Sequence, residues 1–304
     1  MTVHVRSPLG VATIIPIRCA GIVAADFCRS HARAEVAAVF ERSFHLRSGD
    51  LFVCIGEPAI GNGPLTLLAD TRVARLGLHP GQPAVVAANR IAVGTVTFTC
   101  ERSEPWHPPA WPPAVGPHAL ARARETVVQR AAREAPAEGF GRVLADAGEP
   151  RDVFGRIARR HLARLRAWLS IEPMHGPAET SPVHDIVGTG YGLTPSGDDA
   201  LIGALALLDA LGERRAYARL ADAISLVPSG LTSPLSHCFL RVAAAGHVGE
   251  SLHAAVSSIA RGDAASAIAA IRDIGHSSGW DMMAGIVTAL EAVTAPDHAA
   301  LRGR

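Results

Sequence analysis

Lysine is absent from the 304-residue sequence, in which all 29 basic residues other than histidine are arginine. This absence excludes Schiff-base chemistry on lysine, a lysine general base and the lysine of a P-loop. With 28 acidic residues the net charge is only +1, so the chain lacks the one-sided charge of proteins that bind polyanions or membrane surfaces. Neither nucleic acid nor a membrane is predicted as a partner.

Other common signals are missing as well. The five cysteines form no CxxC pair and are predicted to be reduced and buried. No histidine or cysteine cluster has the spacing of a transition-metal site, and the GxSxG motif of serine hydrolases does not occur. The first residues do not resemble a signal peptide, and no apolar run reaches the roughly 18 residues of a membrane helix. We therefore expect a cytoplasmic protein.

The first third of the sequence has the pattern of a small β-rich domain. Short β-type runs separated by turn residues extend from about Val11 to Cys100, with a helix expected from about Ala24 to Phe40. The predicted strands are the runs ATIIPI, GDLFVCIG, GPLTLLA, PAVVAA and IAVGTVTFTC. Residues 1–104 are predicted to form a barrel-like domain.

A proline-rich segment separates this domain from a helical one. Residues 105–117, PWHPPAWPPAVGP, contain six prolines and two tryptophans, which suits a stiff crossing better than a helix or central strand. Residues 118–304 are predicted to be all-α, so the fold class is α+β. The apolar spacing predicts helices at about 120–135, 153–169, 198–212, 214–227, 233–245, 248–261, 263–272 and 279–293.

The segment GTGYGLTPSGDD, residues 188–199, is the strongest candidate for a ligand site. It is a glycine-rich loop that leads into a predicted helix, where free N–H groups and the positive end of the helix dipole favour an anion. It matches neither GxGxxG nor a P-loop. The predicted ligand contacts here are Gly190, Gly192, Thr194, Ser196, Gly197 and Asp198. A simpler interpretation is that Ser196 and Asp199 form a capping box with no ligand.

A second segment repeats this pattern 82 residues later. Ser278-Gly279-Trp280-Asp281 corresponds to Ser196-Gly197-Asp198-Asp199, and Gly203 corresponds to Gly285 inside the two helices. Small residues at these positions allow close helix contact, so we expect the two helices to pack together and present their N-termini to one pocket. Ser277, Ser278, Gly279 and Asp281 are therefore added to the predicted anion site.

His276 lies just before the second helix start, where an imidazole could exchange a proton with a bound oxygen or nitrogen. It is the predicted acid–base residue, with Asp199 as the second catalytic candidate. Asp198, Asp199 and Asp281 could alternatively hold Mg²⁺ through water, although no cofactor is required by the pattern. Between the two starts, Ser233 either caps a third helix or adds a wall to the pocket.

The blocks GTGYGLTPSGDDALIG, LTSPLSHCFLRVAAAGHVGESL and IGHSSGWDMMAG resemble the AllH-type subunit family of oxamate carbamoyltransferase. The resemblance extends in order over about residues 185–292. It implies a role in allantoin and purine-nitrogen breakdown, in which oxalurate and phosphate give oxamate and carbamoyl phosphate. It also implies two partners, a subunit resembling succinyl-CoA synthetase and a second helical subunit.

These expectations are chemically compatible, because oxalurate, oxamate, phosphate and carbamoyl phosphate are all anions. The amides near Gly197 and Gly279 could stabilise the tetrahedral oxyanion, and His276 could protonate the departing oxamate nitrogen. Two other functions stay open: a non-catalytic binding or scaffolding subunit, and a magnesium-dependent phosphotransferase that uses Asp198 and Asp199.

Overall fold

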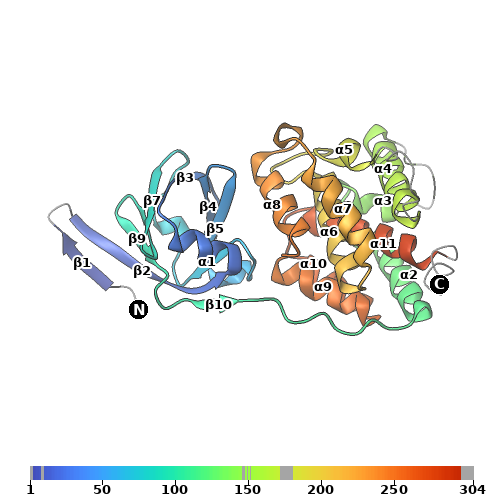
Figure 1. Cartoon of the computed structure of the whole chain (residues 1–304), viewed down its shortest axis with the longest axis horizontal. Coiled ribbons are helices and arrows are strands. Elements are labelled where there is room, and N and C mark those ends of the chain that lie inside the picture. Colours follow the sequence, from blue (N-terminus) through green and yellow to red (C-terminus); the bar gives the residue numbers. More distant parts are fainter. Residues whose placement is uncertain are drawn as a thin grey trace. The chain divides into compact units, whose positions relative to one another are not determined.

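The computed structural model describes residues 3–7, 10–145, 148, 150, 152–171 and 181–295. The chain divides into two compact units, Met1–Pro109 and Ala110–Arg304, which differ in secondary structure (Figure 1). The first contains the strands and the second is helical. No helix in the described residues is both long enough and apolar enough to span a membrane.

The strands of the first unit form a closed barrel. They are β1 (Val3–Ser7), β2 (Gly10–Gly21), β3 (Ala32–Val39), β4 (Ser43–Ser48), β5 (Leu51–Gly56), β6 (Thr66–Ala69), β7 (Pro83–Ala87), β8 (Arg90–Val93), β9 (Val96–Thr99) and β10 (Glu104–Trp106). Within the described residues, neighbouring strands follow the order β2-β6-β5-β4-β3-β7-β8-β9, and β9 returns to β2. The predicted α+β class with an N-terminal barrel is therefore confirmed.

The long strand β2 closes the barrel. Its residues Thr13–Pro16 pair in parallel with β9, and Ile17–Ala20 pair antiparallel with β6. Alternating side chains of the strands fill the interior, where Phe44 and Phe98 are fully buried with ring centroids 5.7 Å apart. Strands β1 and β10 extend β2 outside the closed ring.

The helix predicted from Ala24 to Phe40 is wrong in its second half. Helix α1 spans Ile22–Arg29 and ends where the Ser30 amide and hydroxyl both donate to the carbonyl of Phe27. Residues Ala32–Val39 then form β3, which pairs with β4 on one side and β7 on the other. Alanine and arginine favour a helix in isolation, but the two sheet partners outweigh that preference here.

The sequence pattern also missed β4 and merged β8 with β9. In β4, Phe44 and Leu46 point into the core between partly exposed residues. Strands β8 and β9 are separated at Gly94, whose positive φ of 56° suits a tight turn. Of the five cysteines, Cys28, Cys100 and Cys238 are buried as predicted, whereas Cys19 and Cys54 are partly exposed.

The helical unit follows the predicted pattern closely. Its helices are α2 (Pro117–Glu134), α3 (Gly141–Ala145), α4 (Val153–Ser170), α5 (Val183–Ile186), α6 (Ser196–Ala210), α7 (Arg214–Ser225), α8 (Pro234–Ala244), α9 (Glu250–Ala260), α10 (Ala264–Ile271) and α11 (Ser278–Thr294). The eight helices predicted from apolar spacing are present, and α3 and α5 are short additions. The end of the proline-rich crossing lies on this unit, where the Trp111 indole N–H donates to Asp209 at 2.7 Å and the ring stacks on His253.

Helices α6 and α11 are the centre of this unit. They lie next to each other (Figure 1) and are buried along almost their whole length. They cross at the two repeated glycines: a methyl group on Gly203 would lie 2.0 Å from the Met282 carbonyl oxygen, and one on Gly285 would lie 1.8 Å from that of Ala200. Ala200 and Met282 are themselves 82 residues apart, so the contact is reciprocal. The glycine of each helix leaves room for the backbone of the other helix to approach closely.

We expect Gly285→Ala to lower the free energy of unfolding by about 1–3 kcal/mol or more, because the new methyl group must displace backbone in a close-packed core. Gly230→Ala is the matched control, since a methyl group there meets no atom within 4 Å. Urea unfolding followed by circular dichroism at 222 nm measures both variants. Equal unfolding free energies in the two would contradict the close crossing.

Candidate functional site

The repeat extends backwards from α6 and α11 into the loops that precede them. The Gly197 amide donates to the Thr189 carbonyl at 2.8 Å, and the Gly279 amide donates to the Ile274 carbonyl at 3.0 Å. A methyl group on Gly197 would lie 2.1 Å from the Ile186 carbonyl oxygen, and one on Gly279 the same distance from that of Ile271. The two helix starts therefore have the same local architecture.

The amides of Gly197 and Gly279 are thus engaged inside the protein. The sequence analysis offered them as donors to an oxyanion, but each already has a carbonyl acceptor. Any donors to a ligand at this place must be other groups, of which the nearby hydroxyls are the first choice.

The loop ahead of α6 contains two of the predicted glycines. Gly190 has a φ of 126° and lies against Ser196, where a methyl group would come within 2.6 Å of the Ser196 nitrogen. Gly192 has a φ of 89°, and the space around it is open. Gly190 is therefore needed for the loop to close on the helix, whereas Gly192 is needed for its backbone conformation alone.

Asp198 is fully buried and connects three segments of the helical unit through hydrogen bonds. One of its carboxyl oxygens accepts from the Gly188 amide at 2.7 Å, and the other accepts from the hydroxyls of Ser236, at 2.6 Å, and Thr232. These bonds join the glycine-rich loop, α6 and the start of α8. Most of its acceptor capacity is used by the protein itself.

Asp199, the next residue, is buried but has no such partners. Asp199 is 1% exposed, and neither of its carboxyl oxygens accepts a hydrogen bond from any described residue. The hydroxyls of Thr194 and Ser278 lie near it but bond to each other at 3.2 Å. A buried acceptor without donors is costly, so a native one requires an explanation.

Burial raises the pKa of the Asp199 carboxyl well above its usual value, and the neighbouring charges of Asp281 and Asp198 raise it further. The hydroxyls of Ser278 and Thr194 act in the opposite direction. This environment favours the protonated carboxylic acid, which can donate a proton as well as accept one.

Asp281 is the counterpart of Asp199 in the repeat. One of its oxygens accepts from the amides of Phe140, at 2.5 Å, and Gly141, at 3.2 Å, and the other has no partner in the described part of the chain. Burial raises the pKa of this carboxyl as well, whereas the amides of Gly141 and Phe140 and the nearby hydroxyls of Ser196 and Ser277 lower it. Asp281 thus lies beside the first serine of α6, just as Asp199 lies beside the first serine of α11.

The capping box expected from Ser196 and Asp199 does not form. Helix α6 begins at Ser196 itself and its N-cap, Pro195, makes no side-chain capping bond. Ser278 likewise begins α11, which has no side-chain cap either. In contrast, Ser233 caps α8 by accepting from the Ser236 amide at 3.0 Å. The serines of the two repeated starts face the aspartate of the opposite helix instead.

His276 lies apart from the two buried aspartates. Its side chain is 84% exposed, and its Nε2 is 3.7 Å from the carboxyl of Glu138, which is also exposed. Among the described residues it makes no hydrogen bond or ion pair with Asp199 or Asp281. His276 is thus an exposed residue of the loop that precedes α11.

The three aspartates do not form a metal cluster. Within the described ranges, no group of three or more histidine, cysteine, aspartate or glutamate side chains is arranged to hold a metal ion. The structure therefore adds nothing in support of the magnesium alternative.

Several residues that shape the site carry no recognisable sequence signal. Phe140 and Gly141 reach Asp281 from about 140 positions away in the chain, and only the fold brings them there. Thr232 and Ser236 belong to the hydroxyl-rich segment that was considered as a third wall, and they bond to Asp198.

The family model described as oxamate carbamoyltransferase subunit AllH matches residues 186–290. The matched segment begins at the end of α5 and ends inside α11, so it contains Asp198, Asp199 and Asp281. The resemblance seen in the sequence is confirmed over these residues. Neither the curated proteins nor the solved structures include a significant match to the chain.

The contrast between the two neighbouring aspartates gives a prediction about stability. We expect Asp198→Asn to lower the free energy of unfolding by about 2–3 kcal/mol at neutral pH, because an amide cannot accept all three bonds. Asp199→Asn should instead raise it by about 0.5–2 kcal/mol, since asparagine avoids the free-energy cost of protonating or burying a carboxyl that is ionised in the unfolded chain. Urea unfolding of both variants tests this, and a loss of stability in Asp199→Asn would contradict the assignment.

The raised pKa of Asp199 also predicts how stability depends on pH. Above pH 3.8 the folded chain binds more protons at this carboxyl than the unfolded chain does. The free energy of unfolding should therefore fall as the pH rises from there through the folded pKa. Asparagine does not titrate, so the fall should be smaller in Asp199→Asn. Parallel slopes for the two proteins between pH 4 and 8 would argue against a raised pKa.

Proposed function

Since residues 186–290 match the AllH subunit family, we propose that this chain is a subunit of an oxamate carbamoyltransferase that binds the substrate at the paired starts of α6 and α11. The observation that carries the proposal is the carboxyl of Asp199, which is buried in the matched segment and accepts no hydrogen bond from the residues that the structure describes. A buried orphan acceptor that is also a candidate acid is typical of a catalytic or binding site.

The chemistry requires one proton to move. A phosphate oxygen attacks the carbamoyl carbon of oxalurate, the bond from that carbon to the oxamate nitrogen breaks, and the nitrogen takes up a proton. Asp199 in its acid form donates that proton, and in the reverse direction its carboxylate accepts it. The low-dielectric surroundings that raise its pKa favour the acid form.

The hydroxyls of Thr194 and Ser278 are the proposed donors to the oxyanion. They lie near Asp199, come from the two helix starts and bond to each other at 3.2 Å. A ligand oxygen placed between them could accept from both, and the positive ends of α6 and α11 favour a negative charge there. Ser196 and Ser277, which lie near Asp281, are the equivalent groups of the other half.

His276 is given a role other than proton transfer in this proposal. Because it is exposed and lies beside Glu138, its proposed role is to guide or hold the anionic end of the substrate. If instead His276 supplies the proton, its removal and not that of Asp199 will abolish turnover. The two roles therefore differ in a measurable way.

The proposal includes the setting implied by the family. The reaction would serve allantoin and purine-nitrogen breakdown in the cytoplasm, with a subunit resembling succinyl-CoA synthetase and a second helical subunit as partners. A non-catalytic scaffolding role is the alternative, in which the chain holds the substrate while a partner carries out the transfer.

Turnover of oxalurate with phosphate should fall at least about 100-fold in Asp199→Asn, the usual scale for loss of a general acid. The assay follows carbamoyl phosphate formation by the purified chain alone and after co-expression with the two partner subunits. Asp222→Asn, on the exposed face of α7, is the matched control and should keep full activity. Full activity of Asp199→Asn in the active complex would reject the assignment.

The same assay separates the alternatives. Activity that appears only with partners, and survives in Asp199→Asn, would leave this chain a scaffold. A rate that disappears on chelation of Mg²⁺ and depends on ATP would instead indicate a phosphotransferase. We expect chelation to leave the rate of the phosphate-dependent reaction unchanged, because the aspartates lack the arrangement of a metal site.

A further inference from the structure

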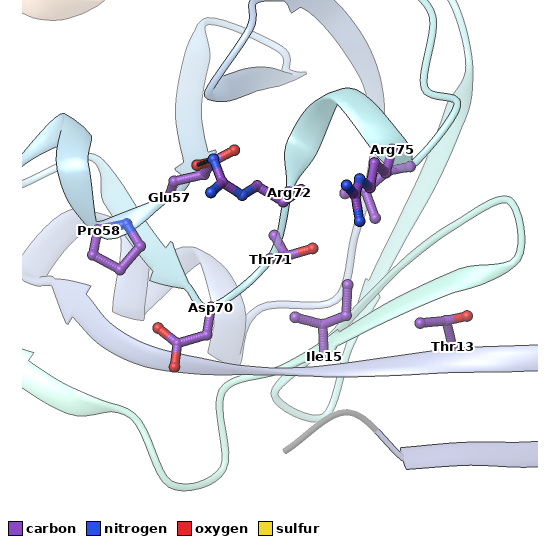
Figure 2. A pocket seen from close by; sticks show the side chains of 9 residues that line it. Thr13, Ile15, Glu57, Pro58, Asp70, Thr71, Arg72 and Arg75 are labelled. Atoms are coloured by element: carbon purple, nitrogen blue, oxygen red, sulfur yellow. Dashed lines mark ion pairs between the residues drawn. The ribbon is translucent and has the colours of Figure 1, made fainter.

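The barrel unit contains a cavity that the helical site does not explain. It has a volume of about 530 Å³, well within the range of small-molecule sites. Figure 2 shows its lining: residues of β2 form the floor, and the segment that follows β6 forms the opposite wall. The lining residues are Thr13, Ile15, Glu57, Pro58, Asp70, Thr71, Arg72, Arg75 and Leu76.

Two arginines belong to this wall. Residues Val73–Arg75 form a single 3₁₀ turn whose N-cap is Arg72. Arg72 precedes this turn with an extended backbone, and Arg75 ends it. Both line the cavity.

The turn is held firmly to the barrel. The carboxyl of Glu57, which is nearly buried, accepts from the Val73 amide at 3.2 Å and forms an ion pair with Arg72 at 3.5 Å. Val73 is 1% exposed and anchors the turn in the core. Asp70, just before the turn, pairs with Arg18 of β2. The arginines therefore project from a preorganised segment, which reduces the entropy lost when a ligand binds.

The charges around the cavity leave one arginine available. Glu57 is paired with Arg72 and Asp70 with Arg18, whereas the guanidinium of Arg75 makes no hydrogen bond or ion pair with any residue that the structure describes. The hydroxyl side chains of Thr13 and Thr71 and the apolar side chains of Ile15 and Leu76 complete the lining. The lining thus offers a free guanidinium, hydroxyls and an apolar wall.

We propose that this cavity is a second binding site, for a small organic anion whose carboxylate or phosphate group is held by Arg75 and Arg72. A guanidinium matches both kinds of group through paired hydrogen bonds. The volume exceeds what a bare inorganic ion fills, so the rest of the ligand lies along Ile15 and Leu76, with its polar atoms toward the threonines. The site lies wholly in the barrel unit and does not depend on the function proposed for the helical unit.

Isothermal titration of the full chain with malonate, glycerol 3-phosphate and inorganic phosphate tests this proposal. At least one of the two organic anions should bind, and Arg75→Gln should weaken that binding about tenfold or more, the effect expected for loss of one charge-assisted contact. Inorganic phosphate should bind more weakly than the organic anion. The malonate and glycerol phosphate titrations show which of the two anionic groups is preferred.

Matched variants place the binding in the barrel. Arg90→Gln is the control, because Arg90 is an exposed barrel arginine outside the cavity whose partner is Glu101. It should bind as the unaltered chain does. If neither organic anion binds, if Arg75→Gln and Arg90→Gln weaken binding equally, or if only Asp199→Asn loses it, the barrel site is overturned. Arg72→Gln, which also frees the buried Glu57, is a supporting variant whose folding is checked by thermal unfolding.

Discussion

The reciprocal crossing of α6 and α11 is the contact on which the candidate site depends. Gly203 and Gly285 bring the two backbones so close that each helix lies against a carbonyl of the other. That distance sets where the first turns meet, and hence places Asp199 near Ser278 and Asp281 near Ser196. A side chain at either glycine would separate the helices and with them the two carboxyls. The close packing of the two helices in the core therefore also determines the positions of the carboxyls at the helix starts.

The two halves of this repeat have diverged in how they satisfy their carboxyls. Asp281 accepts hydrogen bonds from two backbone amides of the 140–141 segment, whereas the equivalent Asp199 accepts none within the described part of the chain. Asp198 is bound to three donors, although it is next in the chain to Asp199. The fold provides hydrogen-bond donors to two of these three clustered carboxyls. Leaving the third without donors lowers stability, and a functional role would explain why that loss is tolerated. This asymmetry singles out Asp199 more sharply than any motif does.

Sequence periodicity was sufficient for the helical unit because its helices are long and amphipathic, and their breaks coincide with glycine, proline or serine. It failed in the barrel where two tendencies competed. The run ARAEVAAV in β3 consists largely of helix formers, and only its pairing with β4 and β7 makes it a strand. In the same way, the repeat Ser-Gly-x-Asp predicted which residues would meet, but not that the Gly197 and Gly279 amides would be used internally. Hydrogen-bond satisfaction is a property of the folded neighbourhood, which no local pattern contains.

The position of His276 also shows that a local sequence pattern does not reveal how exposed a side chain is. Its place ahead of a helix start made it the natural acid–base candidate, yet its side chain is exposed and faces Glu138. Proton transfer within a substrate complex benefits from a group whose protonation state is set by the protein and not by bulk water. Burial raises the pKa of the Asp199 carboxyl, whereas the side chain of His276 is 84% exposed. Chain position identified both residues, and the burial of Asp199 is the reason why the proposed function gives the proton transfer to the aspartate.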